Sequence, residues 1–294
     1  MNKDIRSELE ACIQLIEDRL NSFFNPDGKN YATLLEAMRY SLLSGGKRIR
    51  AVMCIKFCEA VGGKLEDALP AACAIEMLHA YSLIHDDLPC MDNSEMRRGK
   101  PSNHIKYGEF TATLAGDALQ AAAFETLLSS NLPPAIIVKI GQVLADAAGV
   151  HGICGGQYLD LFGEGNELSQ EELLEIHSRK TSALFSAATK IGVLIADGTP
   201  KQITACEDYA QAVGLAFQIR DDILDITATS EQLGKPVGSD SVNRKTTFAT
   251  LNTLSDCEDN ILTQTNKAIS AIKDNFEAPE FLISLAQILA AREK

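Results

Sequence analysis

The chain has 294 residues, 46% hydrophobic and 23% charged, which is the balance of a globular protein. Its net charge of −13 argues against nucleic acid as a partner. We find no apolar run long enough to cross a bilayer, no CxxC pair among the 8 cysteines and no signal-peptide core at the N-terminus. These features predict a cytoplasmic protein without a disulfide framework.

Helical patterns run through the chain, and no strand pattern, internal repeat or linker interrupts them. We therefore predict one all-α domain over residues 1–294. Ser169 and Glu172 form a capping box that marks one helix start. The expected helices span residues 3–22, 32–44, 47–61, 66–87, 108–129, 133–148, 169–196, 201–227, 244–254, 256–273 and 279–292.

The first functional pattern lies between two of these helices, where residues 45–50 read GGKRIR. Glycines allow a close approach to the backbone, and the N-terminus of a helix attracts anions. The pattern is not a P-loop, because no Ser or Thr follows Lys47. It indicates either a phosphate site or a solvated basic helix start.

The segment 81–100, YSLIHDDLPCMDNSEMRRGK, combines an acidic and a basic part. Asp86, Asp87 and Asp92 end an apolar helix, so they emerge from a buried element. Pro89 disfavours a continuous helix, and we expect a loop to carry Asp92 back beside Asp86. Clustered carboxylates with arginines nearby suit Mg²⁺ and a phosphate. A solvated acidic helix end is the alternative.

A second acidic pattern, FQIRDDILDIT, covers residues 217–227. Gln218, Asp221, Asp222 and Asp225 fall on one face of a helix that is apolar elsewhere. This face therefore lines an interior cavity, and two buried aspartate clusters indicate metal between them.

The ordered motifs GGKRIR, DDLPCMD, RRGK, GGQ, KT and DDILD, over residues 42–245, resemble the trans-isoprenyl diphosphate synthases. The resemblance implies an isoprenoid-synthase bundle of long helices around a central cavity, a homodimer, and isopentenyl and allylic diphosphates as substrates. It implies Mg²⁺, or Mn²⁺ in its place, on Asp86, Asp92 and Asp222, with Asp87, Asp221 and Asp225 in support.

The same resemblance assigns basic residues to the two substrates. For isopentenyl diphosphate they are Lys47, Arg50, His79 and Arg98. For the allylic diphosphate they are Arg97, Lys180, Thr181 and Lys235, with Gln218 as a further binding residue. Less specific matches are Gln157 and Asp160 as cavity-lining residues, Lys245, and Arg292 with Lys294 in a basic tail that either covers the site or is solvated.

The reaction that the resemblance implies is head-to-tail prenyl transfer. Tyr81 and Ser82 occupy the chain-length positions before the first aspartates. An aromatic residue at position 81 resembles farnesyl diphosphate synthases of the bacterial type, so we expect a fifteen-carbon product, with geranylgeranyl diphosphate as the alternative. Tyr81 could also be an ordinary core residue.

Two other functional classes share parts of the pattern. A terpene cyclase would have the same fold and first aspartate motif, but it usually carries a different second metal motif and has no need for GGKRIR. A non-catalytic partner subunit should have lost an aspartate cluster, and both clusters are intact in this sequence.

Overall fold

The computed structural model describes residues 3–227 and 245–292. Its first helices are α1 (Lys3–Asn21), α2 (Ala32–Leu42), α3 (Ile49–Ala60), α4 (Leu65–Asp86), α5 (Asn103–Tyr107), α6 (Glu109–Leu128) and α7 (Pro134–Ala148). They are followed by α8 (Ile153–Gly163), α9 (Gln170–His177), the π-helical turn η1 (Ser178–Ser182), α10 (Ala183–Ile195), α11 (Pro200–Thr227), α14 (Phe248–Leu251), α15 (Leu254–Lys273) and α16 (Glu280–Ala290). In the described residues, strands occur as one antiparallel hairpin of β1 (Met96–Arg97) and β2 (Lys100–Pro101). The predicted all-α class is confirmed.

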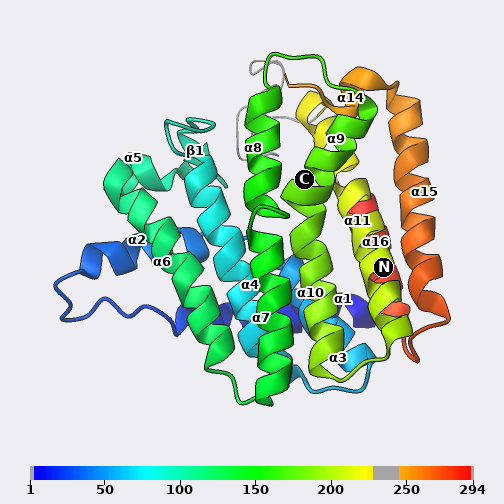
Figure 1. Cartoon of the computed structure of the whole chain (residues 1–294), viewed down its shortest axis with the longest axis horizontal. Coiled ribbons are helices and arrows are strands. Elements are labelled where there is room, and N and C mark those ends of the chain that lie inside the picture. Colours follow the sequence, from blue (N-terminus) through cyan, green and yellow to red (C-terminus); the bar gives the residue numbers. More distant parts are fainter. Residues whose placement is uncertain (1–2, 228–244, 293–294) are drawn as a thin grey trace.

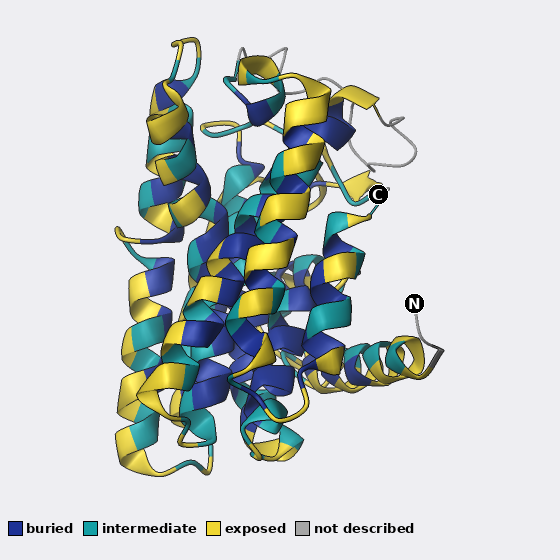
Figure 2. Cartoon of the chain, turned by 90° about the vertical axis from the view of Figure 1, so that its right-hand side faces the viewer, coloured by how far each residue is buried: buried dark blue, intermediate teal, exposed yellow. Residues whose placement is uncertain are grey.

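The centre of the bundle is built around α4. This helix is apolar on most sides, and such a helix is stable only when neighbours cover it. It packs against α3, α6 and α10, while α11 packs against α10 and α15. Figure 1 shows the long helices arranged side by side, with α6 and α15 on opposite flanks. Figure 2 shows buried residues concentrated inside this arrangement. The buried residues of α4 extend to Ile84, so the helix leads from the core to Asp86 at its C-terminal end.

The end of α4 follows the prediction made from Pro89. The helix ends at Asp86, and the following turn brings the backbone N–H of Asp92 within 3.0 Å of the carbonyl oxygen of Asp86. The capping box is also confirmed, because Ser169 Oγ accepts from the N–H of Glu172 at 3.3 Å. Short-range steric effects and capping therefore predict the end of α4 and the start of α9 correctly.

The sequence patterns missed α8 and did not resolve the interruption between α9 and α10. Two glycines, Gly155 and Gly156, lie near the start of α8, and glycine is a poor helix former. The expected helix 169–196 is divided by η1, a feature that apolar periodicity does not reveal. The expected helix 244–254 is helical over Phe248–Leu251, and residue 244 lies outside the described residues.

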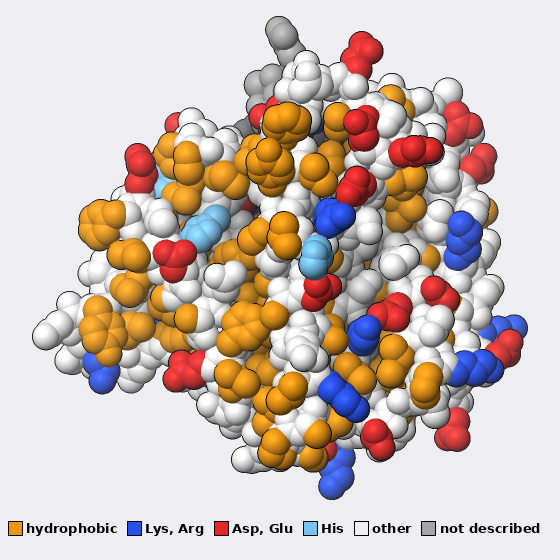
Figure 3. All heavy atoms as spheres, in the orientation of Figure 1, with side chains coloured by type: hydrophobic (Ala, Val, Ile, Leu, Met, Phe, Trp, Pro, Cys, Tyr) orange, Lys and Arg blue, Asp and Glu red, His pale blue; other side chains and the backbone are white. Residues whose placement is uncertain are grey.

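Large apolar side chains gather on one face of the molecule, over the helices α6, α7 and α8 (Figure 3). The exposed ones on these helices include Phe110, Leu114, Val138, Tyr158 and Phe162. Tyr158 and Phe162 stack with ring centroids 5.8 Å apart. Exposed apolar side chains gathered on one face in this way indicate a contact surface.

One stretch differs from the expectation that no run could cross a bilayer. Within the described residues, Pro134–Gly163 is long and apolar enough for a span by length and composition. The stretch is interrupted in the structure, because α7 ends at Ala148 and α8 begins at Ile153. Gln157 and Asp160 of α8 also bond to charged groups of the bundle. We therefore assign this stretch to the helical bundle.

Candidate active site

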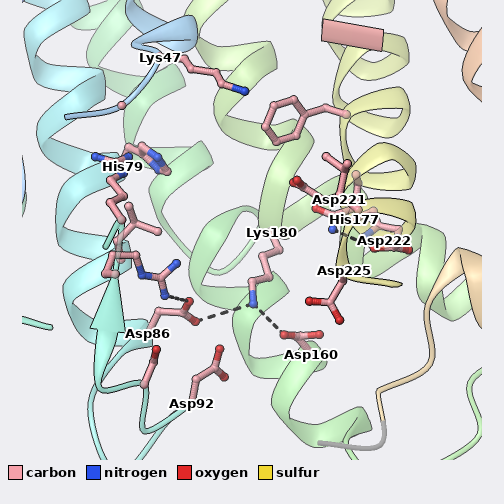
Figure 4. A pocket seen from close by; sticks show the side chains of 18 of the residues that line it. Lys47, His79, Asp86, Asp92, Asp160, His177, Lys180, Asp221, Asp222 and Asp225 are labelled. Carbon is pink, nitrogen blue, oxygen red and sulfur yellow. Dashed lines mark hydrogen bonds and ion pairs between the residues drawn. The ribbon is translucent and has the colours of Figure 1, made fainter. Parts of the chain in front are cut away.

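A cavity of about 1120 Å³ lies between the C-terminal end of α4 and the helix α11. Asp86 and Asp92 line one side of it, and the second aspartate cluster of α11 lines the other. Figure 4 shows the two groups of carboxylates facing one another, with the side chain of Lys180 between them. Residues far apart in the sequence thus form one site, as the two acidic motifs predicted.

Asp86 and Asp92 are held close together by hydrogen bonds around the end of α4. Besides the backbone bond between them, Gln157 Nε2 of α8 donates to Asp86 Oδ1 at 2.6 Å. Burial raises the pKa of Asp92, and the charge of Asp86 raises it further. Asp92 Oδ1 is buried and has no hydrogen-bond partner. Such a pair is stabilised when a cation joins the two carboxylates.

Asp87 is not among the cavity-lining residues, and it anchors an arginine. Asp87 is 2% exposed. Its Oδ1 accepts hydrogen bonds from Arg97 Nη2 at 2.6 Å and from Arg97 Nε at 3.0 Å. Arg97 Nη2 also donates to Asp86 Oδ2 at 3.1 Å. Burial raises the pKa of Asp87, and the bonds from Arg97 oppose this shift. Asp87 therefore fixes Arg97 at the edge of the cavity, beside Asp86.

The second cluster is held by polar contacts across three elements. Asp222 Oδ1 accepts from Gln218 Nε2 at 3.3 Å, and its Oδ2 accepts from the backbone N–H of Phe248 at 2.8 Å. Thr181 of η1 donates its hydroxyl hydrogen to Gln218 Oε1 at 3.0 Å. Thr181 is not among the cavity-lining residues, so it acts on the site through Gln218.

Two lysines lie between the aspartate clusters. Lys180 Nζ donates to Asp160 Oδ2 at 2.7 Å, and Lys245 Nζ donates to the same oxygen at 2.9 Å. The two ammonium groups lower the pKa of the Asp160 carboxyl to about 2, against the opposing effect of burial, the largest single influence. The carboxylate neighbours raise the pKa of Lys245, again against burial. The centre of the cavity is therefore a charged network.

The other end of the cavity is basic and is lined by Lys47, Arg50, His79 and Arg98. Burial lowers the pKa of Arg50 to about 10, which still leaves it protonated at neutral pH, and burial holds the pKa of His79 well below its usual value. The Arg50 guanidinium carbon lies 4.3 Å from the Phe185 ring centroid. This end suits an anion, since it gathers cationic and donor groups.

Arg98 also fixes the loop that precedes α3. Its Nη1 donates to the carbonyl oxygen of Gly45 and to Ser44 Oγ. A Cβ at Gly46 would lie 3.0 Å from the guanidinium, and the positive φ of 129° at this residue also favours glycine. The GGKRIR and RRGK motifs therefore meet in one structural unit.

The residues fit a divalent cation held jointly with a ligand. Among the described residues, no three acidic, histidine or cysteine side chains converge closely enough to hold a metal ion by themselves. Mg²⁺ often takes only one or two carboxylates and completes its shell with water and phosphate oxygens. The Oδ1 of Asp92, which has no hydrogen-bond partner, provides such an oxygen, with Asp86 beside it and Asp222 opposite.

Several predicted residues lie elsewhere than the cavity surface. Tyr81 and Ser82 do not line it. Tyr81 is 4% exposed and its hydroxyl donates to the carbonyl oxygen of Ala148 at 3.4 Å, while Ser82 Oγ donates to the carbonyl oxygen of His79 at 2.9 Å. Lys235 and Lys294 lie outside the described residues.

Arg292 lines the cavity, as expected if the basic tail covers the site. It forms an ion pair with Asp221, and its guanidinium carbon lies 3.6 Å from the Phe217 ring centroid. Sequence reasoning missed His177, Phe185 and Phe217 as lining residues. Periodicity could have placed the two phenylalanines near the motifs that they adjoin, but apolar side chains give no sign of which cavity they face.

An all-helical bundle whose central cavity carries two facing aspartate clusters and a basic end defines the isoprenoid-synthase class of folds. The chain belongs to the polyprenyl synthetase family, whose profile matches residues 31–285. It is a prenyltransferase of the short-chain trans type.

Known proteins resemble it over most of its length. A geranylgeranyl diphosphate synthase of Cyanophora paradoxa is 49% identical, over 80% of this chain and 79% of its own. Geranylgeranyl pyrophosphate synthase 7 of Arabidopsis thaliana is 45% identical, over 88% of this chain and 76% of its own. The apo structure of an FPP/GFPP synthase from Zymomonas mobilis has a TM-score of 0.89 at 31% identity, covering 99% of this chain and 100% of its own.

A second solved structure carries ligands. It is a geranyltransferase of Helicobacter pylori complexed with magnesium and isoprenyl diphosphate, with a TM-score of 0.87 at 31% identity, covering 98% of this chain and 97% of its own. Both of the curated relatives named above are geranylgeranyl diphosphate synthases, whereas the expectation based on Tyr81 was a farnesyl product.

Proposed function

We propose that the protein joins an allylic diphosphate to isopentenyl diphosphate in the cavity described above. The observation that carries this proposal is the arrangement of two aspartate clusters at one end and a basic group of side chains at the other. Two diphosphates can be held apart in such a cavity, each by its own set of charges.

The residues divide the work between the two substrates. Arg97 holds the allylic diphosphate together with Lys180 and Lys245, the two lysines that lie between the aspartate clusters. These cationic groups stabilise the negative charge that grows on the diphosphate as the carbon–oxygen bond breaks. When bound between the clusters, Mg²⁺ supplies further positive charge for the same purpose. Lys47, Arg50 and Arg98 hold isopentenyl diphosphate, with His79 as a neutral partner.

The apolar part of the cavity lining faces the carbon chains. Leu83, Ile176, Phe185 and Phe217 belong to it and keep water away from the allylic cation. The double bond of isopentenyl diphosphate attacks that cation to form the new carbon–carbon bond. The attack leaves a positive charge on a carbon of the isopentenyl unit. A proton then leaves the carbon next to this charge and passes to the released diphosphate, which restores a double bond.

Incubation with labelled isopentenyl diphosphate, an allylic primer and Mg²⁺ tests this function. We expect labelled prenyl diphosphate that depends on all three components. Product formation without isopentenyl diphosphate, as cyclised hydrocarbon, would instead indicate a terpene cyclase. No product with any primer would support a non-catalytic subunit, although both aspartate clusters are intact.

For the product length, we propose geranylgeranyl diphosphate, because the curated relatives that share 44–50% identity with the chain carry that activity in their names. Farnesyl diphosphate is the second candidate. It is favoured by the bulk of Tyr81, a buried ring packed one turn before the aspartates with its hydroxyl near Cys154 Sγ at 3.7 Å. Chromatography of the dephosphorylated products separates the twenty-carbon and fifteen-carbon alcohols.

We also propose a homodimer formed through the apolar face of α6, α7 and α8. The exposed side chains of Phe110 and Phe162, 77% and 71% accessible, would be covered by a second copy. Light scattering should give twice the mass of one chain. Phe110→Glu should shift the protein towards the monomer, whereas a monomeric unmodified protein would refute the proposed assembly.

A cytoplasmic location is proposed as well. All 8 cysteines are free in the structure, as expected in a reducing compartment. Fractionation of cells that express the protein would test this location, and its recovery with the membrane fraction would contradict it.

A further inference from the structure

One carboxylate, Asp160, holds together both lysines at the centre of the cavity. Its Oδ2 accepts from Lys180 at 2.7 Å and from Lys245 at 2.9 Å. The three side chains are mostly buried, with 18%, 28% and 13% of Asp160, Lys180 and Lys245 accessible. Charge-assisted bonds in such surroundings are stronger than those on an exposed surface.

The two lysines have competing partners close by. Lys180 Nζ lies 3.8 Å from Asp86 Oδ1, and Lys245 Nζ lies 3.7 Å from Asp92 Oδ1. Both of these distances exceed a good hydrogen bond, so Asp160 is the preferred partner. Without its charge, Lys180 would move onto Asp86, its nearest remaining anion. Lys245 would then be shared between Glu164, whose Oε1 lies 3.2 Å away, and Asp92.

The helix α8 is built to place Asp160 here. A Cβ at Gly156 would lie 2.2 Å from the backbone nitrogen of Lys180, so only glycine allows α8 to press against η1. Gln157, three residues before Asp160, donates to Asp86 at 2.6 Å. The same face of α8 therefore contacts the first aspartate cluster and the lysine turn.

We propose that Asp160 is a positioning residue that keeps Lys180 and Lys245 together and away from Asp86 and Asp92. The lysines then face the allylic diphosphate, and the two aspartates stay open to Mg²⁺. This inference rests on the proposed function, because it assigns a role within that site. It extends the site to a third acidic position that acts through other residues.

The test compares Asp160→Asn with the unmodified protein in calorimetric titrations of inorganic pyrophosphate at a series of Mg²⁺ concentrations. Asparagine keeps the shape of the side chain and removes its charge. We expect the Mg²⁺ concentration for half-maximal pyrophosphate binding to rise about tenfold or more. In steady-state assays, the KM for the allylic substrate should rise while that for isopentenyl diphosphate changes little.

Two controls separate this role from general damage. Asp146→Asn makes the same charge change on the exposed surface of α7 and should leave the Mg²⁺ dependence unaltered. Glu164→Gln removes a carboxylate 3.2 Å from Lys245 that is not a partner of Lys180, and should have a smaller effect than Asp160→Asn.

A double-mutant cycle distinguishes positioning of the lysines from a purely structural role of Asp160, because only positioning makes the effect on the Mg²⁺ requirement depend on the lysines. In a chain with both Lys180→Gln and Lys245→Gln, Asp160→Asn should no longer raise the Mg²⁺ requirement, because no ammonium group remains to displace. An equal rise with and without the lysines would overturn the proposal, as would an unchanged Mg²⁺ dependence in Asp160→Asn. Because pyrophosphate binding needs no turnover, these outcomes stay distinct from a failure to detect prenyl transfer.

Discussion

At the scale of single residues, the site depends on carboxylates whose charge must be balanced. Asp86 and Asp92 have Gln157, Arg97 and the lysines as neighbours, while Asp222 has Gln218 and the N–H of Phe248. These contacts orient the carboxylate oxygens without fully neutralising them. The oxygens are therefore prepared to bind a cation that arrives with the substrate.

Removing one side of the cavity should greatly reduce turnover. Asp222→Ala is expected to lower kcat/KM about a hundredfold or more, since Mg²⁺ would lose its partner opposite Asp86. Steady-state kinetics at saturating Mg²⁺ measure this loss. Asp208→Ala, an exposed position of the same helix, should leave kinetics unchanged. Near-normal activity of Asp222→Ala would contradict a two-sided site.

His177 should make the fold sensitive to acid. Burial lowers the pKa of His177 to about 4 from 6.5. Between these pH values the unfolded chain binds the proton and the folded chain does not, so stability falls as pH decreases, by at most about 1.4 kcal/mol per pH unit for this group.

Urea unfolding at several pH values would measure the contribution of this histidine. His177→Gln should reduce the loss of stability between pH 6.5 and 4. His151→Gln, which changes an exposed ring, should not have this effect. An unchanged pH dependence in His177→Gln would show that His177 titrates equally in both states.

At the scale of elements, the local sequence determined some features well and others poorly. The end of α4 was predictable because the steric effect of Pro89 is confined to its neighbours. The second aspartate motif was predictable because its spacing places its side chains on one face of a helix. The helix α8 was not, since Gly156 serves a contact with Lys180 that lies 24 residues away and is invisible to local propensity.

Gly156→Ala tests this contact between α8 and η1. The added Cβ would meet backbone atoms of Lys180 at 2.2 and 2.6 Å, so one element must shift. We expect a loss of about 1–3 kcal/mol in the free energy of unfolding, together with reduced turnover. Denaturant unfolding and kinetics measure both.

Gly141→Ala in α7 is the matched control for this substitution. Its Cβ would meet only Leu127 Cδ2, at 3.8 Å, which is ordinary contact. We expect neutral or slightly increased stability there, because alanine favours helix. If both variants behaved alike, tight packing at Gly156 would not be the cause.

At the scale of the whole molecule, the cavity is enclosed by helices from distant parts of the chain. The charged network at its centre joins Asp160 of α8 to Lys180 of η1 and to Lys245, which lie 20 and 85 residues after Asp160. The sequence contains these charges but does not indicate which of them meet, because the pairing is set by tertiary packing. The family motifs therefore revealed the participants, and the structure was needed for the contacts.

The length of the product should depend on the core below the aspartates. Tyr81→Ala is expected to shift the products to longer chains, because it removes a ring of the α4 turn that precedes Asp86. Chromatography of dephosphorylated products measures this shift. Tyr81→Phe keeps the ring and should keep the distribution. An unaltered distribution in Tyr81→Ala would mean that the growing chain extends in another direction.

The π-helical turn Ser178–Ser182 restricts how this segment can change in length. A turn closed by i→i+5 bonds holds one more residue than an α-helical turn would. The residues of α10 are therefore rotated by about 100° relative to a continuous helix from α9. Deleting one residue here would restore regular helix geometry but would turn either Lys180 or the buried face of α10 out of place. Evolution can substitute residues in this turn far more easily than it can shorten it.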